Sequence, residues 1–390
     1  MTSLTKKRIG SLDLLKGLVI VIMALDHVRG YFHYSSHFFD PTDPALTTIP
    51  IFFTRFITHF CAPAFSFLAG VSAFIVGRKK TPAELSGFLI KRGLWLVFVE
   101  LVIMNFGWYF DIGFRNVSFA VIWVLGVSMI LLGGLIRLPN KVIMIFSCVL
   151  IFGHNMLDNI HFENSILWTL LHERGPFLTT PNHIFRVSYA IIPWVAVMSL
   201  GYCFGSFYDK TYEPSKRRTL FNIIGITAIT IFVIIRGANF YGNLLPWEDY
   251  GNLKQTLFSF FNLTKYPPSL SFLLVTLGGA FLFLANTENL KGRVVNFFSV
   301  FGRVPFSFYI LHIYLIHIFA LIAVELTGFG WQKMILPAPP AKVEALKGYG
   351  FNLITVYFIW IGVILLLYPL CKKFDNYKQK HKEKWWLSYL

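Results

Sequence analysis

Stretches of about 20 apolar residues recur along the whole of this 390-residue chain, and they limit its fold more than any other feature. Each stretch is long enough to cross the hydrocarbon core of a bilayer, which is ~30 Å thick. Only 14% of the residues are charged, whereas a soluble domain usually carries about 25%. The sequence therefore predicts an all-α, polytopic integral membrane protein with a single transmembrane domain over residues 1–390.

The apolar stretches define ten candidate spans, and an eleventh is left open: 11–32, 53–77, 88–110, 117–136, 142–157, 187–208, 219–236, 268–286, 304–326 and 349–371. With ten spans, both termini lie on the same side. About 23 of the 35 Lys and Arg residues fall on that side and about nine in the opposite loops, which predicts cytoplasmic termini. The net charge of +16 is therefore a topology signal, and we expect no nucleic-acid partner.

The first span carries ionisable residues at membrane depth, where they are costly and mark a functional site by default. Most of the ionisable and small residues of this helix share one face, about 100° wide. This face carries Asp13, Lys16, Gly17, Ile20, Ala24, His27 and Tyr31. Lys16 and His27 are eleven residues apart, which is about 16 Å along a helix. The alternative for Lys16 is that it reaches the inner interface and pairs with Asp13.

The second span brings a second histidine to a matching depth. It enters from the outer side, so we expect His59 to reach nearly the depth of His27, with Asp26 and Arg55 near that level. A carboxylate beside an imidazole fixes its tautomer and raises its basicity, which general-base catalysis needs.

We therefore predict His27, Asp26 and His59 as catalytic residues, with Arg29 and Arg55 supplying site electrostatics. The alternative for a membrane histidine is a hydrogen bond between packed helices. Two further histidines are interpreted as ordinary residues of the outer loop: His33 and His37.

Weaker candidates lie in the later spans. Glu100, Asn105 and His312 are expected to line the same site, with hydrogen bonds that hold the helices together as the alternative for Glu100 and Asn105. The stretch "KYPPSL" (265–270) opens the eighth span and is a candidate for shaping the outer mouth. We expect the outer loops to influence acceptor choice through Trp247, Glu248, Asp249 and Arg174. The four cysteines have no metal-ligand spacing and no disulfide pattern, and we predict no metal.

Four ordered motifs carry a family resemblance: "RIGSLDLLKGLVIVIMALDHVRGYF", "FFTRFITHFCAPAFSFLAG", "KYPPSLSFLLVTLG" and "FGRVPFSFYILHIYLIH". They resemble the bacterial branch of the heparan-α-glucosaminide N-acetyltransferase family, within the transmembrane acyltransferases. That wider group commonly has an arginine, ten residues and a histidine on the first helix, and Lys16 and His27 have this spacing. The asparagine that lysosomal members use corresponds to His27, whereas their loop histidine has no secure counterpart.

The resemblance implies a catalytic core at about 8–240, followed by C-terminal helices at 265–371 and a basic cytoplasmic tail at 372–390. It implies transfer of acetyl from cytoplasmic acetyl-CoA, a co-substrate, to a sugar or glycan amine or hydroxyl outside. The expected location is the bacterial inner membrane, in contact with the lipid bilayer, and a homodimer is left open.

For the mechanism, we expect His27 or His59 to act as general base in direct transfer, with an acetyl-histidine intermediate as the alternative. For the phosphates of coenzyme A we predict four cations: Lys16, Arg303, Arg8 and Arg92. Its pantetheine arm is expected to lie along the slim helix face from Gly17 to Ala24. The competing function is a proton-coupled small-molecule transporter that uses Asp26, His27 and His59 as a relay. A membrane scaffold without enzymatic activity fits a polar first helix poorly.

Overall fold

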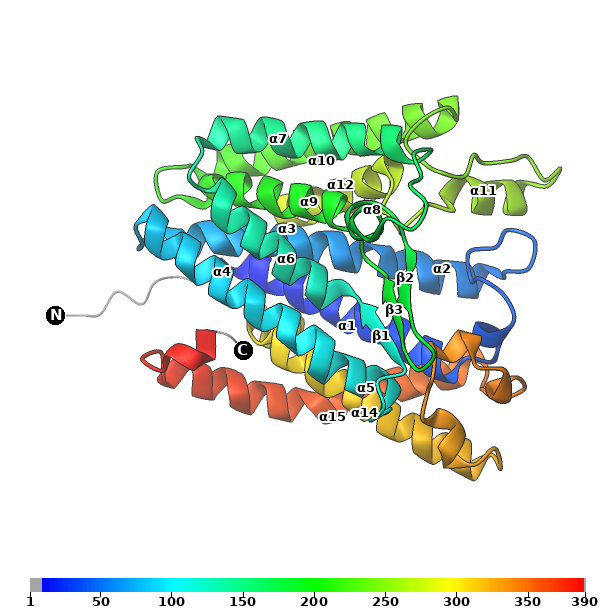
Figure 1. Ribbon diagram of the computed structural model, residues 1–390. Coiled ribbons are helices and arrows are strands. Elements are labelled where there is room, and N and C mark those ends of the chain that lie inside the picture. Colours follow the sequence, from blue (N-terminus) through cyan, green and yellow to red (C-terminus); the bar gives the residue numbers. More distant parts are fainter. Residues whose placement is uncertain (1–8, 389–390) are drawn as a thin grey trace.

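The computed structural model describes residues 9–388, apart from the side chains of His37 and Ser388. The predicted cofactor-binding residue Arg8 lies outside this range. Most of the described chain forms one helical bundle whose long helices run roughly side by side (Figure 1). The start of α1 (Gly10–Phe32) and the end of α15 (Leu353–Lys380) lie at the same end of the bundle (Figure 1).

The predicted spans correspond to helices or to pairs of consecutive helices. Their bounds are α1 Gly10–Phe32, α2 Ile49–Ile57 with α3 Cys61–Gly77, α4 Pro82–Phe98 with α5 Asn105–Tyr109, α6 Val121–Leu135, α7 Asn140–Gly153, α9 Ile191–Phe204, α10 Pro214–Ala238, α12 Leu270–Thr287, α14 Pro305–Leu326 and α15 Leu353–Lys380. Three further helices, α8 Ile166–Leu171, α11 Leu253–Phe261 and α13 Arg293–Arg303, lie between these spans. Among the described residues, seven helical segments are long and apolar enough to cross a membrane. The prediction of a predominantly helical, multi-pass membrane protein is confirmed.

Several boundaries differ from the predicted ones. The spans predicted at 117–136 and 187–208 begin with extended residues, because β1 (Asn116–Phe119) and β3 (Ile184–Val187) pair in parallel. The strand β2 (Gly175–Thr179) adds antiparallel to β3 and completes a small sheet beside the helices. Aromatic and β-branched residues such as those of β3 favour strands as well as membrane helices, so hydropathy alone does not separate the two.

Two differences concern the C-terminal third. The helix α15 continues through Lys380, into the segment predicted to be a tail. The short helix α13 was not predicted; it buries Val300 and Phe301 against the bundle and leaves Arg293 exposed. It packs on α1 and α15 before the chain enters α14.

The helix α1 lies inside the bundle, in contact with α3, α12, α13, α14 and α15. Glycines let it approach α13 closely. A Cβ atom added at Gly17 would lie 1.8 Å from the carbonyl oxygen of Phe298, and one at Gly302 would lie 1.8 Å from that of Asp13. Small residues permit such backbone contacts between membrane helices, so this pair of glycines fixes the position of α1.

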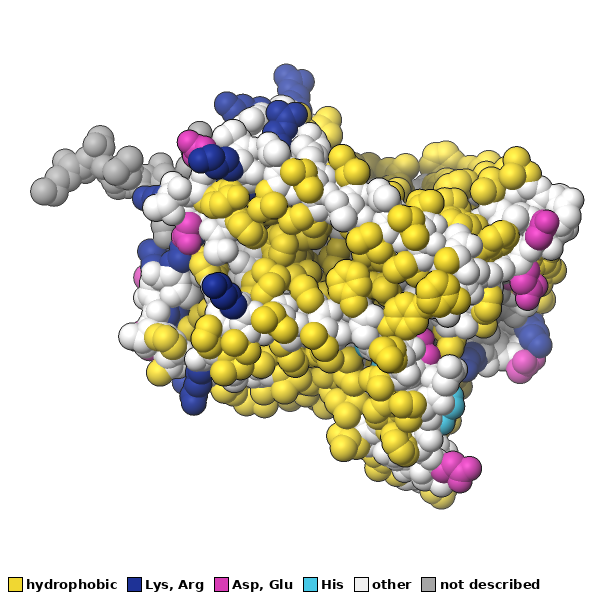
Figure 2. Space-filling model, turned by 90° about the horizontal axis from the view of Figure 1, so that it is seen from above, with side chains coloured by type: hydrophobic (Ala, Val, Ile, Leu, Met, Phe, Trp, Pro, Cys, Tyr) yellow, Lys and Arg dark blue, Asp and Glu magenta, His cyan; other side chains and the backbone are white. Residues whose placement is uncertain are grey.

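The surface agrees with a membrane-spanning bundle. A broad band of hydrophobic side chains covers the middle of the face in Figure 2, and Lys and Arg side chains gather beyond it toward the end where α1 begins. Large exposed apolar residues such as Val149 and Ile234 belong to helices that meet the membrane requirements. Burial of such side chains in lipid accounts for their exposure within the protein.

Candidate active site

A cavity of about 1020 Å³ follows α1 through the bundle. We call the end near Gly10 inner and the end near Phe32 outer. Its wall includes Lys16 at the inner end and His27 at the outer end, about 16 Å apart along the helix. Asp13 and Ile20 lie on the same wall, as the helical periodicity of the sequence predicts. One face of α1 thus lines a path between the two ends.

The small residues of α1 do not form the slim cavity wall that was predicted for the pantetheine arm. Gly17 meets the backbone of α13, and Ala24 is fully buried, so neither lines the cavity. The space is provided instead by small residues of α3, among them Ala62, Ala69 and Ala73. A periodic pattern identifies the face of a helix, but it does not tell which edge of that face meets a neighbouring helix.

Cationic side chains from several helices line the inner end. The Lys16 ammonium donates to the hydroxyl of Ser72 at 2.8 Å, and Nε of Arg303 donates to Asp375 at 2.7 Å. Arg92 lines the same part of the cavity, together with Lys378, which the sequence analysis did not single out. The structure therefore brings together three of the predicted phosphate-binding cations from α1, α4 and α13.

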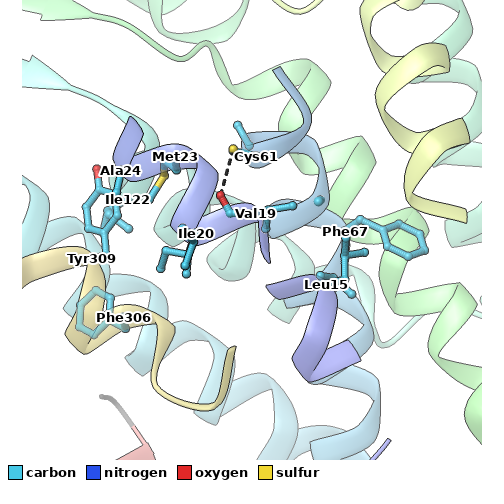
Figure 3. Packing of buried hydrophobic residues seen from close by; sticks show 14 of the residues in the cluster. Leu15, Val19, Ile20, Met23, Ala24, Cys61, Phe67, Ile122, Phe306 and Tyr309 are labelled. Carbon is cyan, nitrogen blue, oxygen red and sulfur yellow. Dashed lines mark hydrogen bonds between the residues drawn. The ribbon is translucent and has the colours of Figure 1, made fainter. Parts of the chain in front are cut away.

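The middle of the cavity is apolar. In Figure 3, Ile20 and Met23 of α1 lie near Ile122, Phe306 and Tyr309, which come from other helices, and all five line the cavity. This apolar section separates the cationic inner end from the polar outer end. A long, thin and mostly uncharged group is the kind of ligand that such a section accommodates.

At the outer end, His27 forms a hydrogen-bonded chain with α14. Its Nδ1 lies 2.8 Å from Nε2 of His312, and Nδ1 of His312 lies 2.9 Å from the carbonyl oxygen of Phe308. Because a carbonyl oxygen only accepts, Nδ1 of His312 must donate to it, and neutral His312 then accepts at Nε2. His27 therefore donates from Nδ1 and keeps an unprotonated Nε2.

This arrangement leaves Nε2 of His27 with a lone pair that can accept a proton. His27 lines the cavity, whereas His312 is fully buried behind it. A second group that fixes the tautomer and orientation of an imidazole is a recurring feature of catalytic histidines. Contrary to expectation, His312 does not itself line the cavity: it is buried behind His27 and Tyr309, which do.

Asp26 does not orient His27 as predicted. One carboxylate oxygen accepts from Nη2 of Arg29 at 2.9 Å, and the other accepts from Nη1 of Arg55 at 2.5 Å. A carboxylate between two guanidinium groups forms strong charge-assisted hydrogen bonds with both. Asp26, Arg29 and Arg55 all line the outer part of the cavity and form one ion-pair cluster there.

The other predicted site residues lie away from the cavity wall. His59 is 2% exposed, and its ring packs against Phe56 and Phe272. Oε2 of Glu100 accepts from two backbone N–H groups at the start of α6, which stabilises that helix end. Asn105 accepts from the backbone N–H of Ser118 in β1. Depth along a span is readable from sequence, but the direction in which a side chain points is not.

Part of the stretch "KYPPSL", predicted above as a candidate for the outer mouth, lies at the outer end of the cavity. Lys265 and Tyr266 of "KYPPSL" line the cavity, together with Arg174 and Tyr189. The guanidinium carbon of Arg174 lies 4.4 Å from the ring centroid of Tyr266, and the Lys265 ammonium lies 5.3 Å from it. The hydroxyl oxygens of Tyr189 and Tyr266 are 3.4 Å apart. Of the four loop residues expected to influence acceptor choice, Arg174 lines the cavity, whereas Trp247, Glu248 and Asp249 do not.

Residues 8–237 match the sequence model of a protein family described as heparan-alpha-glucosaminide N-acetyltransferase, catalytic. The match covers more than half of the chain and includes α1, which carries Lys16 and His27. Arg303, Lys265 and His312 lie beyond the matched segment. No curated protein matches the chain significantly.

Proposed function

The chain belongs to the heparan-α-glucosaminide N-acetyltransferase family, and on this basis we propose that it transfers acetyl from cytoplasmic acetyl-CoA to an extracytoplasmic acceptor. The acceptor atom is an amine nitrogen or a hydroxyl oxygen of a sugar or glycan. One observation carries the proposal: a single cavity joins the cationic inner end to the unprotonated Nε2 of His27 at the outer end.

The three parts of the cavity suit the three parts of acetyl-CoA. The phosphates would bind Lys16, Arg92 and Arg303 at the inner end, because ammonium and guanidinium groups recognise phosphate oxygens. The pantetheine arm would pass through the apolar section beside Ile20 and Met23. The thioester would then lie near His27, in a section that holds back water and strengthens electrostatic interactions.

The reaction uses His27 as general base. As the acceptor nitrogen or oxygen attacks the thioester carbonyl carbon, its proton moves to Nε2 of His27. The tetrahedral intermediate collapses, the carbon–sulfur bond breaks, and the imidazolium returns a proton to the leaving thiolate. Hydrogen bonding from Nδ1 of His27 to His312 favours the imidazolium while it exists. A positioned base contributes roughly 10²–10⁴-fold.

Arg29 and Arg55 have an indirect role in this mechanism. Both hydrogen bond to Asp26, so their guanidinium groups are held at the outer end of the cavity. The two cations outweigh the single carboxylate and favour the negative charge that develops on the carbonyl oxygen. The transporter alternative requires His59 to face the path, whereas His59 lies outside the cavity wall and packs against Phe272.

The test is acetyl-CoA binding and hydrolysis by the purified protein in detergent. We expect saturable binding of CoA and a slow hydrolysis that His27→Ala abolishes while its melting temperature and CoA affinity stay unchanged. Undiminished acetyl transfer by a folded His27→Ala variant would remove His27 as the base. Absence of any CoA binding would reject the acyltransferase proposal.

A further inference from the structure

The outer part of the cavity carries an excess of positive charge. Two carboxylates, Asp26 and Asp40, line it, against five cationic side chains: Arg29, Arg55, Arg174, Lys265 and Lys342. Asp26 is bound to Arg29 and Arg55. Oδ1 of Asp40 accepts from the backbone and hydroxyl of Thr42. Within residues 9–388, neither carboxylate forms a salt bridge with Lys265 or Arg174.

Lys265 is the most informative of these cations. It is 9% exposed, it lines the cavity, and no carboxylate of the described residues lies within salt-bridge distance of its ammonium group. Buried ammonium groups are almost always paired, because desolvation of an isolated charge is costly. An unpaired one beside an open cavity is a preorganised site for an anion.

The neighbours of Lys265 extend the same site. Arg174 and Lys265 both lie within cation–π distance of the Tyr266 ring. The Tyr266 hydroxyl, close to that of Tyr189, adds hydrogen-bonding capacity. Burial by itself raises the pKa of Tyr266, but Lys265, Arg55, the hydrogen bond with Tyr189 and Arg174 more than offset this and lower the pKa. The positive charges at the mouth therefore act on the Tyr266 hydroxyl, which belongs to none of the ion pairs.

The site lies on the acceptor side of the reaction path. Lys265 and His27 line the same cavity, and the apolar section beside Met23 separates both from the inner cations. The phosphates of coenzyme A are assigned to those inner cations, so the outer cations are left for another anion. The remaining substrate is the acceptor.

We propose that the acceptor carries an anionic group, a phosphate monoester or a carboxylate, that binds Lys265 and Arg174 while its amine or hydroxyl reaches His27. The inference rests on the proposed acetyl transfer and specifies its acceptor class. The anion positions the acceptor, and Lys265 is a specificity-determining residue that takes no part in proton transfer.

The experiment compares three amino sugars as acceptors of radiolabelled acetyl from acetyl-CoA: glucosamine, glucosamine 6-phosphate and 2-amino-2-deoxyglucuronic acid. We expect kcat/KM to be at least about tenfold higher for one or both charged sugars, since truncating one partner of a buried charge pair typically costs that much or more. The phosphate and carboxylate arms tell which anion the site prefers. Lys265→Met should reduce the charged sugars to the level of glucosamine, and Lys265→Arg should largely preserve the preference.

The matched control is Lys254→Met, because Lys254 is exposed in an outer loop helix and does not line the cavity. It should leave all three kcat/KM values unchanged. Acetylation of the three sugars with equal kcat/KM overturns the inference and leaves acetyl transfer intact. A Lys265→Met variant that lowers all three values equally also overturns it.

A binding measurement separates the two proposals. Glucosamine 6-phosphate is titrated into protein saturated with CoA, so that the inner cations are occupied, and the heat of binding is recorded. Binding that Lys265→Met weakens at least about tenfold, without acetylation of any sugar, supports the anion site and rejects the proposed function. Binding that is absent or independent of Lys265 overturns the anion site.

Discussion

Replacing His312 by leucine tests how the catalytic base is prepared. In the unchanged protein, Nδ1–H of His27 donates to Nε2 of His312 at 2.8 Å. The substitution removes this acceptor. The imidazole of His27 is then free to adopt the other tautomer, in which Nε2 carries the proton and has no lone pair for the acceptor's proton. The imidazolium formed during transfer also loses its partner.

The size of the effect follows from that single hydrogen bond. A hydrogen bond to a charged group contributes about 1.5–3 kcal/mol, and each 1.36 kcal/mol of barrier changes the rate about tenfold. We therefore expect His312→Leu to lower kcat about 10- to 150-fold. His27→Ala should lower it by the full contribution of a positioned base, roughly 10²–10⁴-fold.

The assay measures kcat and the KM for acetyl-CoA separately, together with melting temperature and CoA affinity. His312 lies behind His27 and away from the inner cations, so KM should stay unchanged. His312→Gln should restore kcat in part, because its amide oxygen can accept from Nδ1 of His27. His317→Leu is the matched control: His317 is a buried histidine of the same helix that bonds to the carbonyls of Gly107 and Met334.

A folded His312→Leu variant with the kcat of the unchanged protein would refute the reasoning, provided that His27→Ala is inactive. A control His317→Leu variant with the same loss of kcat as His312→Leu would show a general packing effect.

The remaining predictions concern the two ends of the cavity and its framework. Arg303→Gln should raise the KM for acetyl-CoA about tenfold with kcat unchanged. The control Arg293→Gln, on the exposed side of α13, should leave this KM unchanged. Equal KM values for the two variants would remove Arg303 from the phosphate site. His59→Leu should keep kcat within a few-fold because His59 is outside the cavity wall, and a loss as large as that of His27→Ala would make it the base. Gly302→Ala should destabilise the fold by about 1–3 kcal/mol and lower the melting temperature, because its Cβ would meet the carbonyl of Asp13. Gly134 has open space around it, so Gly134→Ala should leave the melting temperature unchanged. Equal melting temperatures for the two variants would contradict the close contact of α1 and α13. Burial raises the pKa of Tyr266, but Lys265, Arg55, the hydrogen bond with Tyr189 and Arg174 together lower it to about 8. The phenolate formed above about pH 8 should therefore repel an anionic acceptor and reduce its kcat/KM, and Tyr266→Phe should remove that alkaline decrease; an alkaline decrease that persists in Tyr266→Phe has another origin.

Much of the fold and one wall of the site can be predicted from the sequence. Length and hydropathy locate the membrane helices, because a bilayer requires long apolar segments with satisfied backbone groups. The 3.6-residue period correctly places Lys16, Ile20 and His27 on one face of α1, and that face lines the cavity. These properties are local, so the sequence carries them directly.

The rest of the site depends on contacts between distant segments. His312 is 285 positions from His27, and only the packing of α14 against α1 makes it the hydrogen-bond partner of the proposed base. Asp26 adjoins His27 in sequence, yet its oxygens are bound to Arg29 and Arg55. Adjacent helical residues point about 100° apart, so sequence neighbours are seldom partners, and no local rule reveals which remote side chain fills the gap.

A structure of the protein with bound CoA tests most directly whether the cavity is a transmembrane reaction path. We predict that the phosphates contact Lys16 and Arg303 at the inner end and that the sulfur lies beside Nε2 of His27, beyond the apolar section formed by Ile20 and Met23. CoA bound outside this cavity, or with its sulfur held at the inner end, would contradict the account.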